Sequence, residues 1–428
     1  MSKSKKNKRV LIITYYWPPS GGAGVQRWLK FSKYLIEFGW DPVIYTPENP
    51  DVPVVDQSLL NEIPSDVTIL KLPIFEPSRT ISIFGGDQST GRTGAESKSG
   101  GKKSIRNELT RWVRGNIFIP DARAMWIKPS GRFLKKWLAK NPVDAIISTG
   151  PPHSMHLIGL KVKKAFPDLI WLTDFRDPWS DMDYLDEFKM GARARKKLVK
   201  MEKEVVKKCD HILINSPSIA NTLFETLDNS KHTLIPNGWD KNDFENLTPS
   251  SNNRLVYRIG HFGALYGSRN APGLWKAVTK WNSEQERQVE IILVGSIGEE
   301  VRKDLENIDC IKHLAGVNHK EAILEMMNCD ALLLVQNDTD ASRKCTPGKV
   351  FEYLATRKPI VSICNSPSDL ATRLTDWGLP FCDHNDDATA YKMLHSIIIE
   401  NGQKNVDPSP YERKALTKEL SVLLDNLT

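Results

Sequence analysis

Short runs of consecutive apolar residues alternate along the chain with longer segments whose apolar residues recur every three or four positions. The short runs are typical of buried parallel strands, and the longer segments are typical of amphipathic helices. In the first half the pattern predicts strands at residues 10–15, 42–45, 67–72, 145–148, 169–173, 211–215 and 233–235, and helices at 24–38 and 187–208. In the second half it predicts strands at 255–262, 289–294, 311–314, 331–335 and 360–363, and helices at 272–281, 319–328, 348–356 and 411–427. The alternation predicts an α/β protein with parallel, doubly wound sheets.

The domain organisation follows from length and from a break in the pattern. The chain has 428 residues, more than one hydrophobic core usually supports. The strand–helix pattern restarts after residues 244–254, a polar stretch typical of a linker. We predict two Rossmann-like domains, residues 1–245 and 255–405, facing each other across a central cleft. A last helix lies within residues 408–428, and residues 85–104, rich in Gly, Ser, Lys and Thr, are expected to form a mobile loop.

Composition narrows the classes of protein to consider. Hydrophobic residues make up 40% and charged residues 26% of the chain, as in ordinary globular proteins. The net charge of +7 suits an anionic substrate or membrane surface but is too small to predict binding of nucleic acid. None of the six cysteines has C-x-x-C or metal-ligand spacing, which predicts reduced thiols in a cytoplasmic protein. No apolar run approaches the ~18 residues that span a bilayer, and the one after the basic start is too short for a signal peptide.

Residues 102–140 form a basic stretch, with eleven Lys and Arg against two acidic residues. Aromatic residues such as Trp112, Trp126 and Trp137 lie among these charges. Such a stretch can contact an anionic membrane or a lipid diphosphate at the periphery. Alternatively, its apolar residues pack on the first domain while its charges stay in solvent.

The segment from residue 344 to 355, KCTPGKVFEYLA, predicts a loop that begins a helix at the carboxyl end of the second sheet. Thr346 suits the N-cap, and Pro347 and Gly348 follow at the helix start. The free N–H groups of a helix N-terminus attract anions, and Lys349 adds a positive charge. Glu352 follows within the first two turns, where its carboxylate can accept two hydrogen bonds from a ribose diol. The alternative is a capped, half-buried helix without a ligand.

Glycine-rich loops follow two other strands. Gly21, Gly22 and Gly24 join the first strand to the first helix, and Gly263 begins a loop that reaches Arg269. Glycines let a ligand approach the backbone closely, and an arginine can hold a phosphate with its planar group. Gly295 ends a further strand at the same edge. The first loop is neither a dinucleotide-binding nor a Walker motif, and both loops can also be tight turns.

Polar residues also follow two strands of the first domain. His153 comes after Pro151 and Pro152 without the further ligands of a zinc site. As a neutral imidazole it can hydrogen-bond a sugar hydroxyl, or it can be a packed loop residue. Asp174, Arg176 and Asp177 place three charges together, which predicts either a polar acceptor site or a local ion pair.

Together these motifs, in this order and spacing, resemble the family-4 retaining glycosyltransferases of GT-B fold over nearly the whole chain. The marks are 21-GGAG-24, 235-IPNG-238 with Asp240, the loop 263–269, 294-VG-295, and the segment 347–359 with Glu352. The sequence PGKVFEYLA, together with 174-DFRDPW-179, resembles the motifs of a bacterial branch of this family that is involved in surface polysaccharide assembly.

The resemblance implies transfer of a sugar from a nucleotide-diphosphate donor to a glycan or lipid-linked acceptor, with retention and without a metal or other cofactor. It implies that Glu352 binds the ribose, that Arg269 and Lys349 hold the diphosphate, and that the glycine loop near residue 22 approaches the phosphates. His153 corresponds to a histidine near the donor sugar, and catalysis would rest on His153, Arg269 and Lys349. Lys344 stands where the family has a sugar-binding glutamate, and Ala264 and Leu265 stand where it has a basic residue. Alternatives are a sugar-nucleotide epimerase or hydrolase on this fold, and a non-catalytic nucleotide-sugar-binding protein.

Overall fold

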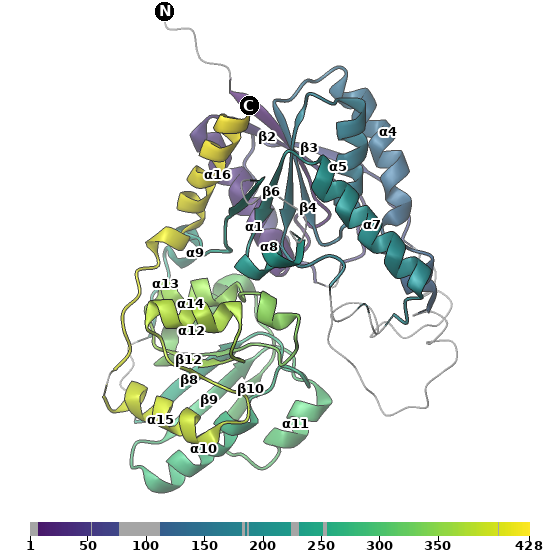
Figure 1. The fold of residues 1–428 in the computed structure, drawn as a ribbon. Coiled ribbons are helices and arrows are strands. Elements are labelled where there is room, and N and C mark those ends of the chain that lie inside the picture. The colour runs from purple at the N-terminus through teal and green to yellow at the C-terminus, as the bar shows by residue number, and fades with distance from the viewer. Residues whose placement is uncertain are drawn as a thin grey trace, which may run out of the picture. The chain divides into compact units, whose positions relative to one another are not determined.

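The computed structural model describes residues 7–52, 54–76, 112–181, 185, 188–223, 231–250, 255–400 and 402–428. The expected loop 85–104 lies outside these residues. The described chain divides into two compact units (Figure 1). The first unit contains the described residues up to Asn237 and from Arg413 onward, and the second contains those from Gly238 to Glu412. The predicted cleft between the two domains stays a prediction.

The division between the units lies a few residues before the polar stretch 244–254. Residues just after Gly238 are already tied to the second unit. The Trp239 amide donates to the carbonyl of Tyr411 at 3.1 Å, and its indole donates to the carbonyl of Pro408 at 2.8 Å. Asp240 then caps the short helix α9 (Lys241–Phe244) by accepting from the amide of Asn242 at 3.0 Å. These bonds, rather than composition, fix where the second unit begins.

The first unit is built on a seven-stranded parallel sheet with strand order β3-β2-β1-β4-β5-β6-β7. Its strands are β1 (Lys8–Ile13), β2 (Trp40–Pro47), β3 (Thr68–Leu72), β4 (Ala145–Gly150), β5 (Ile170–Phe175), β6 (His211–Ile214) and β7 (His232–Leu234). Chain order reverses between β1 and β4, which pair in parallel. In open α/β sheets the carboxyl ends of strands beside such a reversal are where ligands bind.

Helices cover both faces of this sheet. On one face lie α4 (Ile127–Leu138), α5 (Ser154–Ala165), α7 (Ala192–Lys208) and α8 (Pro217–Leu223), which share one apolar core. On the other face lie α1 (Ala23–Leu35) and α16 (Arg413–Leu427) (Figure 1). The last helix joins the first unit because Leu416, Leu420 and Leu424 recur at helical spacing and pack in the core of Val25 and Trp28.

The second unit has a six-stranded parallel sheet with order β10-β9-β8-β11-β12-β13. Its strands are β8 (Tyr257–Phe262), β9 (Val289–Val294), β10 (Ile311–Leu314), β11 (Ala331–Val335), β12 (Ile360–Ile363) and β13 (Phe381–Cys382). The helices α10 (Pro272–Glu284) and α15 (Asp387–Ile398) pack on one face. The helices α12 (His319–Asn328), α13 (Lys349–Thr356) and α14 (Asp369–Trp377) pack on the other, and α11 (Glu299–Leu305) follows β9. The order reverses between β8 and β11.

The fold class is the one that the sequence predicts: two α/β units with parallel, doubly wound sheets. Two of the predicted helix starts differ from the structure by two to five residues. The expected helix 187–208 begins at Ala192, and the expected helix 411–427 begins at Arg413 after a turn of 3-10 helix at Ser409–Tyr411. Among the residues that the structure describes, no helix is both long and apolar enough to cross a membrane.

Candidate functional site

In the second unit, two glycines bring the ends of β8 and β9 together. The amide of Gly263 donates to the carbonyl of Val294 at 2.9 Å, and φ is +153° at Gly263 and +132° at Gly295. A side chain at Gly295 would collide with the backbone of Gly263, so Gly295 serves packing. A side chain at Gly263 would meet only the Nε2 atom of His261, at 3.7 Å. Gly263 therefore leaves its neighbourhood open, whereas Gly295 is filled by protein.

Arg269 is held at this edge by the loop after β11. Its Nε donates to Oδ1 of Asn337 at 2.6 Å, and its guanidinium carbon lies 5.1 Å from the centre of the Tyr266 ring. The amide of Asp338 donates to the carbonyl of Ser268 at 2.5 Å, which ties the two loops together. Nη2 of Arg269 has no hydrogen-bond partner in the part of the chain that the structure describes. The guanidinium is thus oriented on one side and available on the other.

His261 is a candidate site residue that sequence reasoning missed. It is 5% exposed on β8, and its Nδ1 lies 3.0 Å from the carbonyl of Leu333, so Nδ1 carries the proton. Burial lowers the pKa of His261 to about 4, with nearby Arg269 and Lys349 acting in the same direction. Its Nε2 is a buried acceptor without a partner among the described residues. The available signal was its position on the predicted strand two residues before Gly263, because alternate residues at a strand end face either the core or a ligand.

The helix that carries Lys349 and Glu352 begins later than expected. α13 starts at Lys349, Gly348 occupies the N-cap, and no side chain caps it. The prediction of Thr346 as N-cap and Pro347 as first helical residue is therefore wrong. The reason lies in Gln336, whose Nε2 donates to the carbonyls of Ser342 at 2.7 Å and Cys345 at 3.0 Å. These bonds keep the chain extended at Cys345, and Thr346 is buried beside it.

Lys349 and Glu352 form an ion pair, with Nζ 2.6 Å from Oε2. The two side chains are 33% and 18% exposed, so the pair is reachable from solvent. His319, at the start of α12, lies 3.3 Å from Asp243. Burial lowers the pKa of His319, but its hydrogen bond to Asp243 and the nearby Glu352 outweigh burial and raise it. Oε1 of Glu352 has no hydrogen bond from the described residues, so one carboxylate oxygen can accept from a ligand.

The second unit thus collects complementary groups around one edge. Arg269 and Lys349 both act on the pKa of His261, which places the two cations in one neighbourhood. Partner-free acceptors, Nε2 of His261 and Oε1 of Glu352, accompany them. Two cations suit a diphosphate, and a carboxylate oxygen suits a hydroxyl.

In the first unit, Asp174 is saturated by protein. It is fully buried and accepts from Nε and Nη2 of Arg27 at 3.0–3.2 Å. The Trp28 indole at 2.7 Å and the Thr149 hydroxyl at 2.8 Å complete its shell. Burial raises the pKa of Asp174, but Arg27 and Arg176 outweigh burial and hold it below the usual value. Of the two interpretations, the ion pair applies to Asp174.

Arg176 joins two loops. Its Nη1 donates to the carbonyl of Gly24 at 2.9 Å, and its Nη2 donates to the carbonyl of Pro151 at 2.6 Å. Its Nε donates to the carbonyl of Gly150 at 3.3 Å. A guanidinium that is bonded to three carbonyls fixes the start of α1 against the end of β4. Arg176 therefore positions backbone in this structure.

Asp177 differs from its two neighbours. It is half-buried, and no described residue donates a hydrogen bond to it. Burial raises the pKa of Asp177, Arg176 opposes this, and Asp174 adds to it. A partly accessible carboxylate at the end of β5, with no hydrogen-bond donor among the described residues, is available to a ligand hydroxyl.

His153 is more buried than a residue at an open loop, with 3% exposure. Its ring stacks on Trp179 with centres 4.9 Å apart, and neither ring nitrogen has a partner in the described chain. Burial lowers the pKa of His153 well below its usual value, with His156 and Arg176 adding to the effect. The imidazole is neutral, as the sequence suggested, and its role with a sugar stays a prediction.

The first glycine loop is fixed largely by protein contacts. A side chain at Gly21 would press on Val54, and one at Gly24 would press on the ring of Tyr16. Gly22 has φ of +84° and nothing within 4 Å of a side chain placed there. It forms the N-cap of α1 without a side-chain cap. Gly22 is therefore the one of the three around which space is open.

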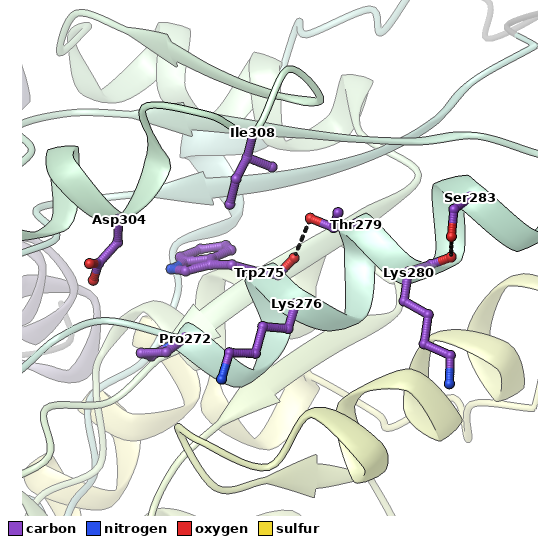
Figure 2. A pocket seen from close by; sticks show the side chains of 8 residues that line it. All are labelled: Pro272, Trp275, Lys276, Thr279, Lys280, Ser283, Asp304 and Ile308. Atoms are coloured by element: carbon purple, nitrogen blue, oxygen red, sulfur yellow. Dashed lines mark hydrogen bonds between the residues drawn. The ribbon is translucent and has the colours of Figure 1, made fainter.

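A hollow of about 690 Å³ lies along α10, and Trp275 is among the residues that line it (Figure 2). None of the predicted site residues lines it. The hydroxyls of Thr279 and Ser283 donate to carbonyls of their own helix at 2.9 and 2.7 Å (Figure 2). Asp304 accepts from Asn270 at 2.7 Å. These polar groups of the hollow are bonded to neighbouring protein groups and do not converge on one point. The edge of the sheet is therefore the better candidate for the ligand site.

No protein-family model and no curated protein matches the sequence. Solved structures match it along almost its whole length. A glycosyltransferase from Rickettsia africae ESF-5 has 13% identity and a TM-score of 0.60, with 99% of each chain covered. The E. coli trehalose-6-phosphate structure with bound UDP-2-fluoro glucose has 12% identity and a TM-score of 0.55, with 97% of this chain and 96% of that chain covered. A protein described as a UDP-N-acetylglucosamine 2-epimerase from Listeria monocytogenes has 9% identity and a TM-score of 0.57, with 98% and 96% covered.

Because the sequence identities are this low, the structural matches establish only the fold, and the activity has to be argued from the site. The matches span both units of the chain and nearly all of the matched proteins. Together with the two parallel sheets, they show that this chain has the GT-B fold.

Proposed function

We propose that the protein is a glycosyltransferase that moves a sugar from a nucleotide-diphosphate donor to a glycan or lipid-linked acceptor. The observation that carries the proposal is the set of available groups at the edge of the second unit. Two oriented cations, Arg269 and Lys349, accompany a carboxylate with a free oxygen, Glu352. A nucleotide diphosphate presents two anionic phosphates and a ribose diol, which match these groups in kind.

Each group has a definite task in this proposal. The diphosphate takes Nη2 of Arg269 and draws Lys349 away from its ion pair with Glu352. The N-terminal end of α13 adds its favourable potential for an anion. Glu352, released from the lysine, accepts from the ribose hydroxyls. Binding therefore exchanges an internal ion pair for two charge-assisted contacts to the donor.

The proposed chemistry retains the anomeric configuration. The bond from the sugar to the diphosphate breaks through an oxocarbenium-like state, and negative charge grows on the leaving phosphate. Arg269 and Lys349 stabilise that charge, so no metal is needed in the proposal. The proposal assigns no carboxylate as the nucleophile, so the acceptor attacks from the face that the leaving group departs. In the first unit, Asp177 offers its carboxylate to an acceptor hydroxyl, and neutral His153 offers a hydrogen bond to a sugar.

The broader setting is also a proposal. The resemblance to enzymes of surface polysaccharide assembly supports a cytoplasmic enzyme that works near the inner face of the cell membrane. The likeness to a protein described as a sugar-nucleotide epimerase favours one alternative, an epimerase or hydrolase that acts on the donor alone. A non-catalytic nucleotide-sugar-binding protein is the other alternative, because Lys344 replaces the expected glutamate.

A two-stage experiment tests the proposal. Thermal denaturation is followed with a panel of nucleoside diphosphates and their sugars, and we expect one nucleotide class to raise Tm well above the rest. Glu352→Ala should abolish that shift, whereas the matched control Asp304→Asn, on the hollow of Figure 2, should retain it. An unchanged shift in Glu352→Ala would refute the site.

The second stage identifies the reaction. The preferred donor is incubated with the protein alone and with lipid-linked and free glycan acceptors. Transfer only with acceptor supports the transferase, and the anomeric configuration of the product tests retention. Turnover of the donor alone would assign an epimerase or hydrolase. Tight binding without turnover under any condition would assign a binding protein.

A further inference from the structure

The helical layer formed by α4, α5 and α7 on the first unit has an extreme charge. These helices carry fifteen Lys and Arg residues and only two acidic residues, Glu202 and Glu204. The whole chain has a net charge of only +7, so the rest of the chain is net negative. The three helices share one core on one face of the sheet (Figure 1). Positive charge is therefore concentrated on a single face.

Several of these cations have no acidic partner among the residues that the structure describes. Neither α4 nor α5 contains any Asp or Glu. Lys163 pairs with Asp210 at 2.7 Å, and Lys164 pairs with Glu204 at 2.6 Å. No described residue forms an ion pair with the exposed side chains of Lys128, Arg132, Lys135 and Lys161. Four like charges without counter-charges repel one another unless a polyanion is bound.

The same four side chains line a groove between α4 and α5. The groove has a volume of about 420 Å³, and Gly131, Ala165 and the acid-paired Lys164 also line it. Gly131 lets the stem of Lys161 lie directly against α4, because a side chain there would collide with that stem. The charges on two helices thus converge from both sides on a space that could hold a phosphate group.

Exposed apolar side chains stand at one end of this layer. Met125 is 53% exposed and precedes Lys128 by one turn. Trp112 and Ile117 are 47% and 57% exposed, in a segment that Asn116 joins to the start of α7 by accepting from the amide of Gly191 at 2.8 Å. In the chain α4 comes after the parallel strand β3, and α7 comes after the parallel strand β5. Both helices therefore begin on the side of the sheet where the strands end. Large apolar side chains beside unpaired cations suit the interface of a bilayer better than they suit a free phosphate or a nucleic acid.

We propose that the outer face of the α4–α5–α7 layer binds the surface of an anionic lipid bilayer, with headgroup phosphates in the α4–α5 groove. The surface accounts for the unpaired cations and for the exposed apolar residues together. It extends the proposed function, because a lipid-linked acceptor would lie at that surface, but it does not depend on any sugar transfer.

Co-sedimentation with vesicles tests this proposal on the full chain without donor. We expect binding to phosphatidylcholine vesicles that contain about one third phosphatidylglycerol, and little binding to phosphatidylcholine alone. Replacing Lys128, Arg132, Lys135 and Lys161 together by Gln should lower the partition coefficient by about fivefold per charge, several hundred-fold in all. The matched control removes four exposed lysines of the second unit, Lys276, Lys303, Lys392 and Lys404, and should bind vesicles nearly as well as the wild type.

Further experiments distinguish an anionic bilayer from a free phosphate or a nucleic acid as the ligand of this surface. Trp112→Ser should weaken vesicle binding several-fold, since a bilayer uses the indole. Equal vesicle binding by the two four-residue variants would overturn the proposal. So would displacement by inorganic pyrophosphate at constant ionic strength, or tighter binding to an RNA oligonucleotide than to anionic vesicles. Retained donor-induced thermal shifts in the groove variant would show that the fold and the nucleotide site survive, so failure here is distinguishable from failure of the proposed function.

Discussion

The two units place charged residues at the same edge of their sheets but use them in opposite ways. In the first unit, the carboxylate of Asp174 accepts hydrogen bonds from four donor groups: Nε and Nη2 of Arg27, the Trp28 indole and the Thr149 hydroxyl. In the second unit, Nη2 of Arg269 and Oε1 of Glu352 have no partner among the described residues. Saturated groups hold a structure together, and unsaturated groups are left for a ligand.

The difference teaches how to interpret a cluster of charges. Asp174, Arg176 and Asp177 lie within four positions, yet only Asp177 has an available carboxylate. Charged residues that are close together in the sequence therefore predict a polar site. Whether that site is structural or is available to a ligand depends on which of its atoms already form hydrogen bonds. The predictions that follow test this contrast.

The largest effect is expected from Asp174. Asp174→Ala leaves the buried guanidinium of Arg27 without its counter-charge, which should lower the free energy of unfolding by about 3–5 kcal/mol. Glu352→Ala should cost under about 1 kcal/mol, because its ion pair with Lys349 is partly exposed. Urea denaturation followed by circular dichroism measures both. Comparable losses in the two variants would contradict the contrast between the units.

Lowering the pH should also destabilise the first unit more than the second. Burial holds the pKa of His156 at about 3, whereas the unfolded chain protonates it near 6.5. The unfolded chain thus binds more protons between these values, so the stability contribution is complete above about pH 6.5 and falls by about 1.4 kcal/mol per pH unit below it. His153 and His211 have lowered pKa values in the same unit. In the second unit the lowered pKa of His261 is opposed by the raised pKa of His319.

Hydrogen exchange between pH 7 and pH 5 measures this difference. Amides of β4 and β5 should lose more protection than those of β8 and β11. His156→Gln should flatten the pH dependence of the first unit and leave that of the second unchanged. Equal acid sensitivity in both units, or no change in His156→Gln, would contradict the assignment.

The sequence predicted the architecture well, because buried strands and amphipathic helices have distinct periods. The strands 289–294, 311–314, 331–335 and 360–363 match β9 to β12 residue for residue. It missed β13, which has only two residues, and several helices, among them α5, α8, α11, α14 and α15. A two-residue strand has no period to detect, and its existence depends on pairing with Ser362 and Ile363.

The candidate site was less predictable, for physical reasons. Sequence identifies residue types such as Glu352 and Arg269, but it does not show which of their atoms the fold occupies. The start of α13 depends on Gln336, nine positions before Cys345, whose amide binds both ends of the intervening turn. His261 gave no motif signal, since its importance rests on one unpaired ring nitrogen. Such long-range hydrogen bonds are set by the tertiary fold and not by local propensity.

Orientation of the free cation gives a smaller effect. Asn337→Ala removes the 2.6 Å bond to Nε of Arg269 and leaves the guanidinium mobile. Under the proposed function, donor affinity should fall about tenfold, the equivalent of roughly 1.4 kcal/mol, and stability should change little. Calorimetric titration with the preferred nucleotide measures this change. Asn282→Ala, which removes amide hydrogen bonds to β9 elsewhere in the unit, is the matched control and should keep the donor affinity of the wild type.

The smallest effect on stability is expected at Asp177, and it completes the contrast with Asp174. Because burial raises its pKa, Asp177 favours the folded state more when protonated than when charged. At neutral pH the charge of Asp177 destabilises the folded state. Asp177→Asn should therefore leave the free energy of unfolding unchanged or raise it by a few tenths of a kcal/mol. Under the proposed function the same change should lower kcat/KM for the acceptor without altering donor affinity. A variant that loses stability as Asp174→Ala does would make Asp177 a structural residue, whereas stability retained with transfer impaired would support its role at the acceptor.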